Sequence, residues 1–188
     1  GSWNLLRTVA MVPDEVRALV DYCDERSLPL WLVSEQRSRF NYHFNDRVPV
    51  VMAEIHTEIP ERCDLHTMLQ EPVVKAVMFL TAQEVREGPL SFMPHARSTQ
   101  WFIHGQDIIP AEGGKLPAMR FIAEANGWTP DELMAFGDSE NDNEMLRYAG
   151  TGVAMGNALE ETKAASDYVT DDCDDEGVAH ALAHFALI

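Results

Sequence analysis

The spacing of apolar residues predicts short strands and helices in alternation along the first 110 or so positions. After Pro13, apolar residues recur at helical spacing, and Asp14 and Glu15 lie in the first turn, where carboxylates favour the helix dipole. Pro29 ends that helix. Apolar runs of strand length predict strands at 5–11, 30–34 and 73–80, and 98–110 predicts two strands joined at His104-Gly105.

The rest of this first part is less regular. Residues 35–50 predict a hairpin strand plus a loop, and a helix is expected near 60–69. Thr81 is a typical N-cap for a short helix that begins at Ala82 and ends before Gly88. Together these elements predict a small α+β domain over residues 1–110.

A more regular alternation begins near Gly113-Gly114, so we expect the second domain at 111–188. Strand–helix alternation with short loops predicts a parallel sheet covered by helices. The expected order is helix 115–126, strand 132–136, helix 140–148, strand 152–155, helix 158–165, strand 167–170 and helix 175–184.

Composition narrows the function. The chain has 188 residues, 46% of them apolar, and a formal charge of −17. Duplex binding needs Lys and Arg to neutralise phosphates, and an acidic protein is repelled by anionic lipids, so neither nucleic acid nor a membrane is an expected partner. A small phosphorylated ligand stays possible, because a divalent cation reverses the local field. The acidic run 171–176 is most simply a solvated loop.

The three cysteines are Cys23, Cys63 and Cys173, and they form no Cys-x-x-Cys pair. An odd number of widely spaced cysteines argues against a disulfide framework or a zinc knuckle. A reducing, cytoplasmic location is therefore expected.

The densest chemical signal is Phe136-Gly137-Asp138-Ser139-Glu140-Asn141-Asp142. Asp138 directly follows an apolar strand, at the edge where parallel sheets build their sites, and Asn141 and Asp142 lie in the first turn of the next helix. Carboxylates, an amide and a helix N-terminus suit a hard cation together with a phosphoryl group. A polar turn that only caps a helix is the alternative.

Two further segments contribute to this picture. Lys115 begins a helix after two glycines and could reach an anion as a mobile charge, although an exposed surface lysine is the simpler interpretation. The run 152–158 predicts a strand ending at Gly156, after which Asn157 could cap a helix, with Glu160 completing a capping box.

These motifs, in this order, closely resemble the C-terminal part of Cof-type haloacid-dehalogenase (HAD) phosphatases. The resemblance rests on Lys115, the Gly-Asp-x-x-Asn-Asp motif at 137–142, Gly-Val-Ala-Met-Gly-Asn-Ala at 152–158 and the run 163–170. It covers residues 113–188 firmly, and 5–110 more weakly resembles the cap domain of these enzymes. The fold it implies is α/β: the C-terminal half of a Rossmann-like parallel-sheet core, preceded by an α+β cap that sets substrate specificity.

The resemblance also implies a mechanism. In the family, the first aspartate of an Asp-x-Asp-Gly-Thr motif attacks phosphorus and the second is the general acid and base. Mg²⁺ is held by that first aspartate, a backbone carbonyl and the residue matching Asp138, with Asp142 orienting a metal-bound water or the lysine. Asn141 would position the phosphoryl group, and Lys115 would neutralise developing charge. The implied substrates are small phosphorylated metabolites such as sugar phosphates.

One departure is decisive: the chain contains no Asp-x-Asp-Gly-Thr. Asp172-Cys173-Asp174 has the spacing but is followed by Asp175-Glu176, and 32–37 is only a faint echo of the family's second motif. We therefore expect a fragment without turnover, whose sheet edge would pair with a missing N-terminal core segment or with a second copy. The alternative is a non-catalytic HAD-like binding or regulatory module. Arg37, Trp101 and His104 are the candidate substrate contacts, each of them more often structural or simply exposed.

Overall fold

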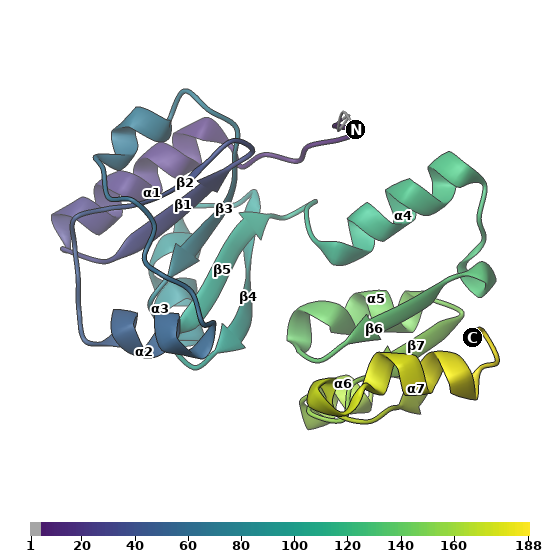
Figure 1. Cartoon of the computed structure of the whole chain (residues 1–188). Helices are drawn as coiled ribbons and strands as arrows, with labels where there is room; N and C mark the ends of the chain where they lie inside the picture. Colours follow the sequence, from purple (N-terminus) through teal and green to yellow (C-terminus); the bar gives the residue numbers. More distant parts are fainter. Residues whose placement is uncertain (1–4) are drawn as a thin grey trace. The chain divides into compact units, whose positions relative to one another are not determined.

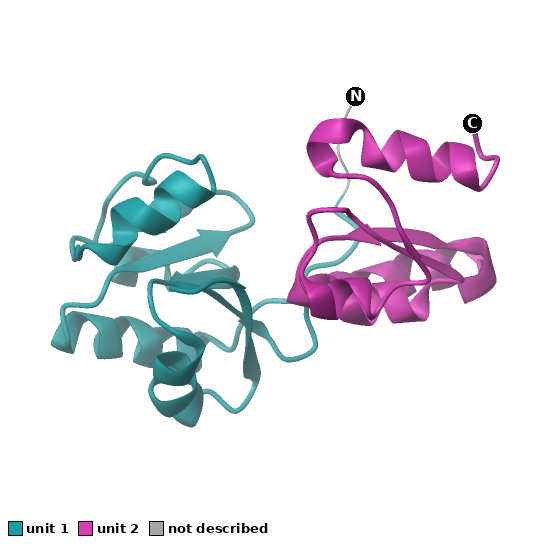
Figure 2. Cartoon of the chain, turned by 90° about the horizontal axis from the view of Figure 1, so that it is seen from below, with its two compact units in different colours: residues 1–113 teal, residues 114–188 magenta. Residues whose placement is uncertain are grey.

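The computed structural model describes residues 5–188 and consists of two compact units (Figures 1 and 2). Unit 1 ends at Gly113 and unit 2 comprises Gly114–Ile188. The division falls within a few residues of the boundary expected from the sequence. Among the described residues, no helix has the length and apolar character needed to cross a membrane.

Unit 1 is built on a five-stranded antiparallel sheet. The strand order is β2-β1-β3-β5-β4, and each neighbouring pair is antiparallel. The longest ladders join β4 to β5 and β1 to β3. The strands are β1 (Leu30–Ser34), β2 (Ser38–Phe40), β3 (Val73–Met78), β4 (Ala96–Phe102) and β5 (Gly105–Pro110).

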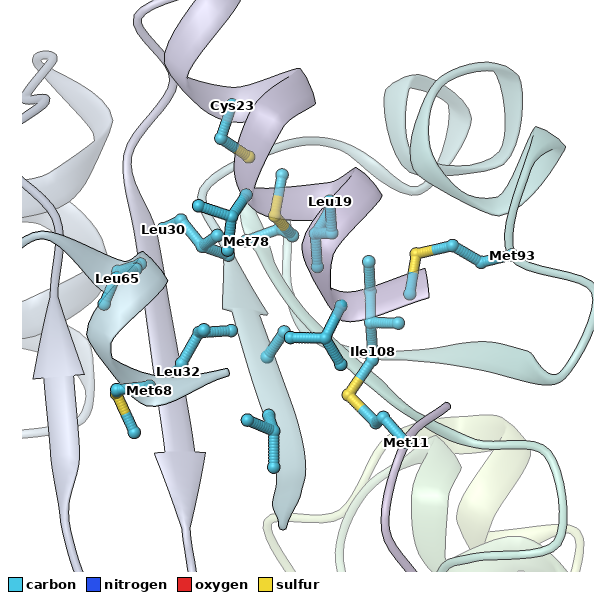
Figure 3. Packing of buried hydrophobic residues seen from close by; sticks show 14 of the residues in the cluster. Met11, Leu19, Cys23, Leu30, Leu32, Leu65, Met68, Met78, Met93 and Ile108 are labelled. Atoms are coloured by element: carbon cyan, nitrogen blue, oxygen red, sulfur yellow. The ribbon is translucent and has the colours of Figure 1, made fainter. Parts of the chain in front are cut away.

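Alternation along these strands sends side chains to two apolar layers. One face, with Leu32, Met78 and Ile108, packs against α1 (Pro13–Glu25), α3 (Ala82–Glu87) and the 3-10 helix η1 (Leu65–Met68). Figure 3 shows Leu19 of α1 beside these strands. The opposite face, with Val77 and Phe79, packs against α2 (Arg47–Glu54). A second 3-10 helix, η2 (Pro89–Ser91), follows α3.

The predicted strands at 30–34 and 73–80, the hairpin at 98–110 and the helices after Pro13 and Thr81 are confirmed. The first helix ends at Glu25, before Pro29. Thr81 caps α3 through a capping box with Glu84, in which each side chain bonds the other residue's backbone N–H.

Two expectations in unit 1 are wrong. Residues 5–11 form no strand, and at the end of the segment the N–H of Met11 donates to the Val73 carbonyl at 2.8 Å. The helix expected near 60–69 is only the 3-10 turn η1, whereas residues 47–50, expected to be loop, form the first part of α2 (Arg47–Glu54). The helix α2 accommodates Pro49 because this residue lies in the first turn, where no intrahelical N–H bond is lost.

Unit 2 has a parallel sheet in the order β6-β7-β8, which confirms the predicted alternation. Figures 1 and 2 show α4 and α5 on one side of this sheet and α7 on the other. The elements are α4 (Lys115–Asn126), η3 (Pro130–Glu132), β6 (Met134–Gly137), η4 (Glu140–Asp142), α5 (Asn143–Tyr148), β7 (Thr151–Ala154), α6 (Glu160–Lys163), β8 (Tyr168–Val169), η5 (Cys173–Asp175) and α7 (Gly177–His184).

The capping expected of Asn157 is not observed. The helix α6 begins three residues later, after Leu159, and has no side-chain cap. The Asn157 side-chain oxygen instead accepts a hydrogen bond from the N–H of Cys173 at 3.3 Å. Asn157 therefore ties the loop before α6 to the acidic segment at η5, a tertiary role that local spacing does not encode.

Candidate active site

The strand β6 places Asp138 at the carboxyl edge of the unit 2 sheet. β6 ends at Gly137, and Asp138 follows with an exposed side chain. A Cβ at Gly137 would lie 2.4 Å from the Asp142 Cβ, so only glycine allows the strand end and the following turn to approach this closely. The Asp138 carbonyl accepts the N–H of Leu159 at 3.0 Å, which anchors the turn to the segment before α6.

Asp142 is the buried centre of the site. It is only 1% exposed, and its Oδ2 accepts the backbone N–H of Asp138 at 3.1 Å and of Ser139 at 3.3 Å. An ionised carboxylate is an acceptor only, so these two N–H groups match its charged form. Burying a charge is tolerable only with such partners.

Lys115 supplies the opposite charge. It is the first residue of α4, and its Nζ lies 2.5 Å from Asp142 Oδ1, which makes a short charge-assisted hydrogen bond. The lysine side chain is 48% exposed whereas the aspartate is buried. The buried Asp142 carboxylate therefore holds the partly exposed Lys115 ammonium in place near the strand ends.

Asn141 completes the loop. Its side-chain oxygen accepts the hydroxyl of Ser139 at 2.8 Å, and the N–H of Asp142 donates to the Ser139 carbonyl at 2.9 Å. With that oxygen engaged, the amide NH₂ of Asn141 is the group that can donate to an anion. Sequence reasoning left Ser139 out, because its contribution comes from a backbone N–H and a hydroxyl directed within the turn.

The four residues singled out from the sequence thus lie in one place. Lys115 and Asp142 are in direct contact, Asp138 is joined to Asp142 through its backbone N–H, and Asn141 is joined to the same turn through Ser139. Both oxygens of Asp142 are occupied by protein donors, so Asp142 suits a positioning role. The exposed Asp138 carboxylate suits direct ligation of Mg²⁺, which prefers one or two carboxylates with waters and phosphate oxygens.

A second acidic cluster lies elsewhere in unit 2. Within the described residues, Asp172, Cys173 and Asp174 are the group whose potential metal-ligating atoms lie within 4.8 Å of one another. They are consecutive residues at η5, mostly exposed, and the Asp172 carboxylate accepts the N–H of Asp174 at 3.1 Å. The cluster is a self-capped acidic turn, in line with the solvated loop expected from the sequence.

The candidate substrate contacts all fall in unit 1. Arg37, in the turn between β1 and β2, forms an ion pair with Glu71, which precedes β3. The Trp101 indole N–H donates to Asp107 at 3.0 Å, and the ring covers Gly105. His104 lies in the turn between β4 and β5 and is half-buried. Their part in substrate binding stays a prediction.

A parallel strand-and-helix unit with a lysine–aspartate pair at its strand ends is typical of α/β proteins that bind their ligands at that edge of the sheet. The chain belongs to the haloacid dehalogenase-like hydrolases, a family that matches residues 2–182. The resemblance seen at 113–188 is thereby confirmed, and it extends through unit 1, where the sequence indicated it only weakly.

Individual relatives agree with this assignment. The putative phosphatase YkrA of Bacillus subtilis is 29% identical over 92% of this chain and 66% of its own length. The 5-amino-6-(5-phospho-D-ribitylamino)uracil phosphatase YcsE of the same organism is 45% identical over 39% of this chain and 29% of its own. The structure of a HAD subclass IIB sugar phosphatase has a TM-score of 0.83 at 30% identity, over 95% of this chain and 68% of that protein.

The chain matches only part of the length of these relatives. It spans just under two thirds of YkrA and 68% of the sugar phosphatase, so about a third of each has no counterpart among the 188 residues.

Proposed function

We propose that this chain forms the magnesium- and phosphate-binding part of a phosphatase that acts on small phosphorylated metabolites such as sugar phosphates. The observation that supports it most directly is the buried Asp142 carboxylate, which holds the Lys115 ammonium at 2.5 Å beside the exposed Asp138. The substrate class is supported by two similar proteins, the HAD subclass IIB sugar phosphatase and the 5-amino-6-(5-phospho-D-ribitylamino)uracil phosphatase YcsE.

Each residue has a role that follows from its contacts. Lys115 neutralises charge that develops on the phosphoryl oxygens, and Asp142 positions it, because the carboxylate is itself fixed by two backbone N–H groups. Asn141 donates its amide NH₂ to a phosphoryl oxygen. Asp138 ligates Mg²⁺, which when bound supplies positive charge to the phosphate.

Turnover also requires an aspartate nucleophile, and the sequence contains no Asp-x-Asp-Gly-Thr. The edge strand β6 pairs with β7 on one side only among the described residues, which leaves its other side free for a further strand. We infer that such a strand, carrying the nucleophile, completes the site, and that the present chain binds ligand without hydrolysing it.

Ligand binding is tested without turnover. Binding of Mn²⁺, as a paramagnetic stand-in for Mg²⁺, is measured by water-proton relaxation with and without inorganic phosphate. Asp138→Asn should weaken binding by about tenfold or more, the usual cost of an altered metal ligand set. Asp175→Asn, in the exposed acidic turn, is the matched control and should bind as the unmodified chain does. Equal affinity in both variants would remove Asp138 from the metal site.

Catalysis is tested by addition. The chain alone, assayed on an aryl phosphate with Mg²⁺, should show no turnover, and joining it to a segment that supplies an Asp-x-Asp-Gly-Thr strand should create activity. In that joined protein Lys115→Met should lower kcat by about 10²–10³, the scale of a lost electrostatic group. Robust turnover by the chain alone would contradict the requirement for an added nucleophile.

The missing motif also favours a second candidate, a HAD-like module that binds phosphorylated ligands without chemistry. The two are separated by the joined protein. If it binds Mn²⁺ and phosphate through Asp138 but gains no turnover, the binding module is the better description of the chain.

A further inference from the structure

The C-terminal half of α1 carries an unusual charge arrangement. Asp21 and Asp24 lie near the negative end of the helix dipole, and the last turn holds no basic residue. Arg26 follows the helix but is turned toward Glu25, at 3.1 Å, and over the Tyr22 ring, at 4.2 Å. Within the last turn of α1, no basic residue therefore offsets the charges of Asp21 and Asp24.

His66, in η1, has a carboxylate on each side of its ring. Its Nε2 lies 2.9 Å from Asp21 of α1, and its Nδ1 lies 2.9 Å from Asp64, the N-cap of η1. Asp24 is the next carboxylate, 3.9 Å from Nδ1. A neutral imidazole has one N–H donor and can satisfy one carboxylate, whereas the imidazolium has two. The geometry therefore fits the protonated ring.

A second histidine approaches the same helix. His43, in the loop between β2 and α2, has its Nε2 3.0 Å from Asp24. Asp24 thus faces His43 with one oxygen and His66 with the other. With neutral rings the three carboxylates of the cluster carry a formal charge of −3, so protonation of His66 relieves the repulsion among them.

We propose that His66 is a proton-operated clamp, which in its protonated form fastens η1 to the C-terminal half of α1 and releases it when the proton is lost. The clamped element matters to the unit 1 core, because Leu65 and Met68 of η1 are buried in it. Release would loosen η1 while its two apolar side chains still retain it, so the device adjusts local opening and leaves the fold intact.

The direction of the effect follows from the same contacts. Hydrogen bonds to Asp21 first and to Asp64 second raise the pKa of His66 above its ordinary value. A group whose pKa is raised by folding stabilises the folded state fully below its ordinary pKa. That stabilisation is lost as pH rises through the folded-state value. The backbone N–H and ring of His66 conversely lower the pKa of Asp64.

The test is a histidine titration of the full chain by NMR, followed at the His66 ring. Asp21→Asn and Asp64→Asn should each lower the His66 titration midpoint, because each removes one carboxylate from the imidazolium. Asp14→Asn, on the exposed first turn of the same helix, should leave it unchanged. A midpoint that is the same in the unmodified chain and in both cluster variants would sink the proposal.

Amide hydrogen exchange provides the second readout. The N–H of Leu69 donates to the His66 carbonyl and that of Thr67 to the Asp64 carbonyl, so both report on η1. After correction for intrinsic exchange, their protection should fall about two- to fivefold as His66 loses its proton, which is the scale of an exposed ion pair. In His66→Gln the loss should be present at every pH. If the exchange protection of Leu69 and Thr67 in the unmodified chain does not change with pH, the clamp is contradicted.

Discussion

The two units differ in how completely they bury their apolar residues. The sheet of unit 1 has helices on both faces, and one continuous cluster joins α1, α3, η1 and the central strands. The apolar cluster of unit 2 is smaller, with Ala135, Leu146 and Ala149 as its buried residues. Its longest helix, α4, buries only Ala123, whereas Ile122 and the following Trp128 are each 48% exposed.

Unit 1 therefore has the larger apolar core, whereas unit 2 carries the candidate site. Burial of apolar area is the main favourable term in folding, so unit 1 should carry most of the stability. Unit 2 holds its site through hydrogen bonds around Asp142, and among the described residues its edge strand β6 pairs on one side only. We therefore expect the candidate site to lie on the less stable unit.

The largest expected effect tests that division. Leu32→Ala removes a fully buried side chain from the centre of unit 1 and should cost about 3 kcal/mol of unfolding free energy. Leu146→Ala, 1% exposed in unit 2, should cost nearer 2 kcal/mol, because its thinly covered neighbours can collapse into the space. Urea unfolding should show two transitions, and each variant should shift one of them. A single transition moved equally by both contradicts independent units.

A smaller effect is expected at the strand end of unit 2. Gly137→Ala places a Cβ within 2.4 Å of the Asp142 Cβ, so the carboxylate must move away from Lys115. The cost should be about 1–3 kcal/mol in the unit 2 transition, with weaker Mn²⁺ binding. Gly127→Asn is the control, because Gly127 has a positive φ of 70° that asparagine tolerates, and nothing lies within 4 Å of its added Cβ. Unchanged Mn²⁺ binding in Gly137→Ala would show that Asp142 does not depend on this contact.

Sequence reasoning succeeded where local chemistry decides the structure. The strands and helices of unit 2 were placed by apolar runs and short polar turns, and Asp138 was correctly put just past β6, because strand ends and glycine turns are local features. The α3 cap was found for the same reason, since Thr81 and Glu84 satisfy each other within one turn.

Sequence reasoning failed where the structure of a segment depends on residues far away in the chain. The apolar run 5–11 finds no strand to pair with, and Asn157 bonds to Cys173 rather than to its own helix. The pair formed by Lys115 and Asp142 spans 27 positions, and spacing alone favoured an exposed surface lysine at position 115. The resemblance to the family indicated that pairing, because members of a family share a folded site in which distant motifs come together.

A buried polar residue in unit 1 provides a test of the stability of that unit by itself. Gln106 of β5 is 0% exposed, and neither its side-chain oxygen nor its nitrogen has a hydrogen-bond partner among the described residues. Gln106→Leu should therefore stabilise unit 1 by about 1 kcal/mol, because an unsatisfied buried amide is removed. Gln100→Leu, opposite it on β4 and only half-buried, should change stability by less than about 0.5 kcal/mol. Destabilisation by Gln106→Leu would mean that the amide is satisfied in solution.

The smallest expected effect concerns the polar tie between α2 and α3 of unit 1. Arg47 contacts Glu84 at 2.7 Å, and that bond, above all, lowers the Glu84 pKa to about 2. A lowered pKa adds stability above the ordinary value of 4.5, and this is lost as pH falls from 4.5 toward about 2. Because the two side chains are 33% and 43% exposed, Glu84→Gln should cost below about 1 kcal/mol at pH 6.

The difference between the unmodified chain and Glu84→Gln should shrink to nothing near pH 2, which urea unfolding across this range measures directly. Glu87→Gln alters a neighbouring carboxylate, which accepts a hydrogen bond from the Gln83 amide at 2.9 Å, and it corrects for general titration of acidic groups. If the tie belongs to unit 1 alone, only the unit 1 transition responds. A matching response in the unit 2 transition would mean that the two units unfold together, which would contradict the difference in stability expected from their cores.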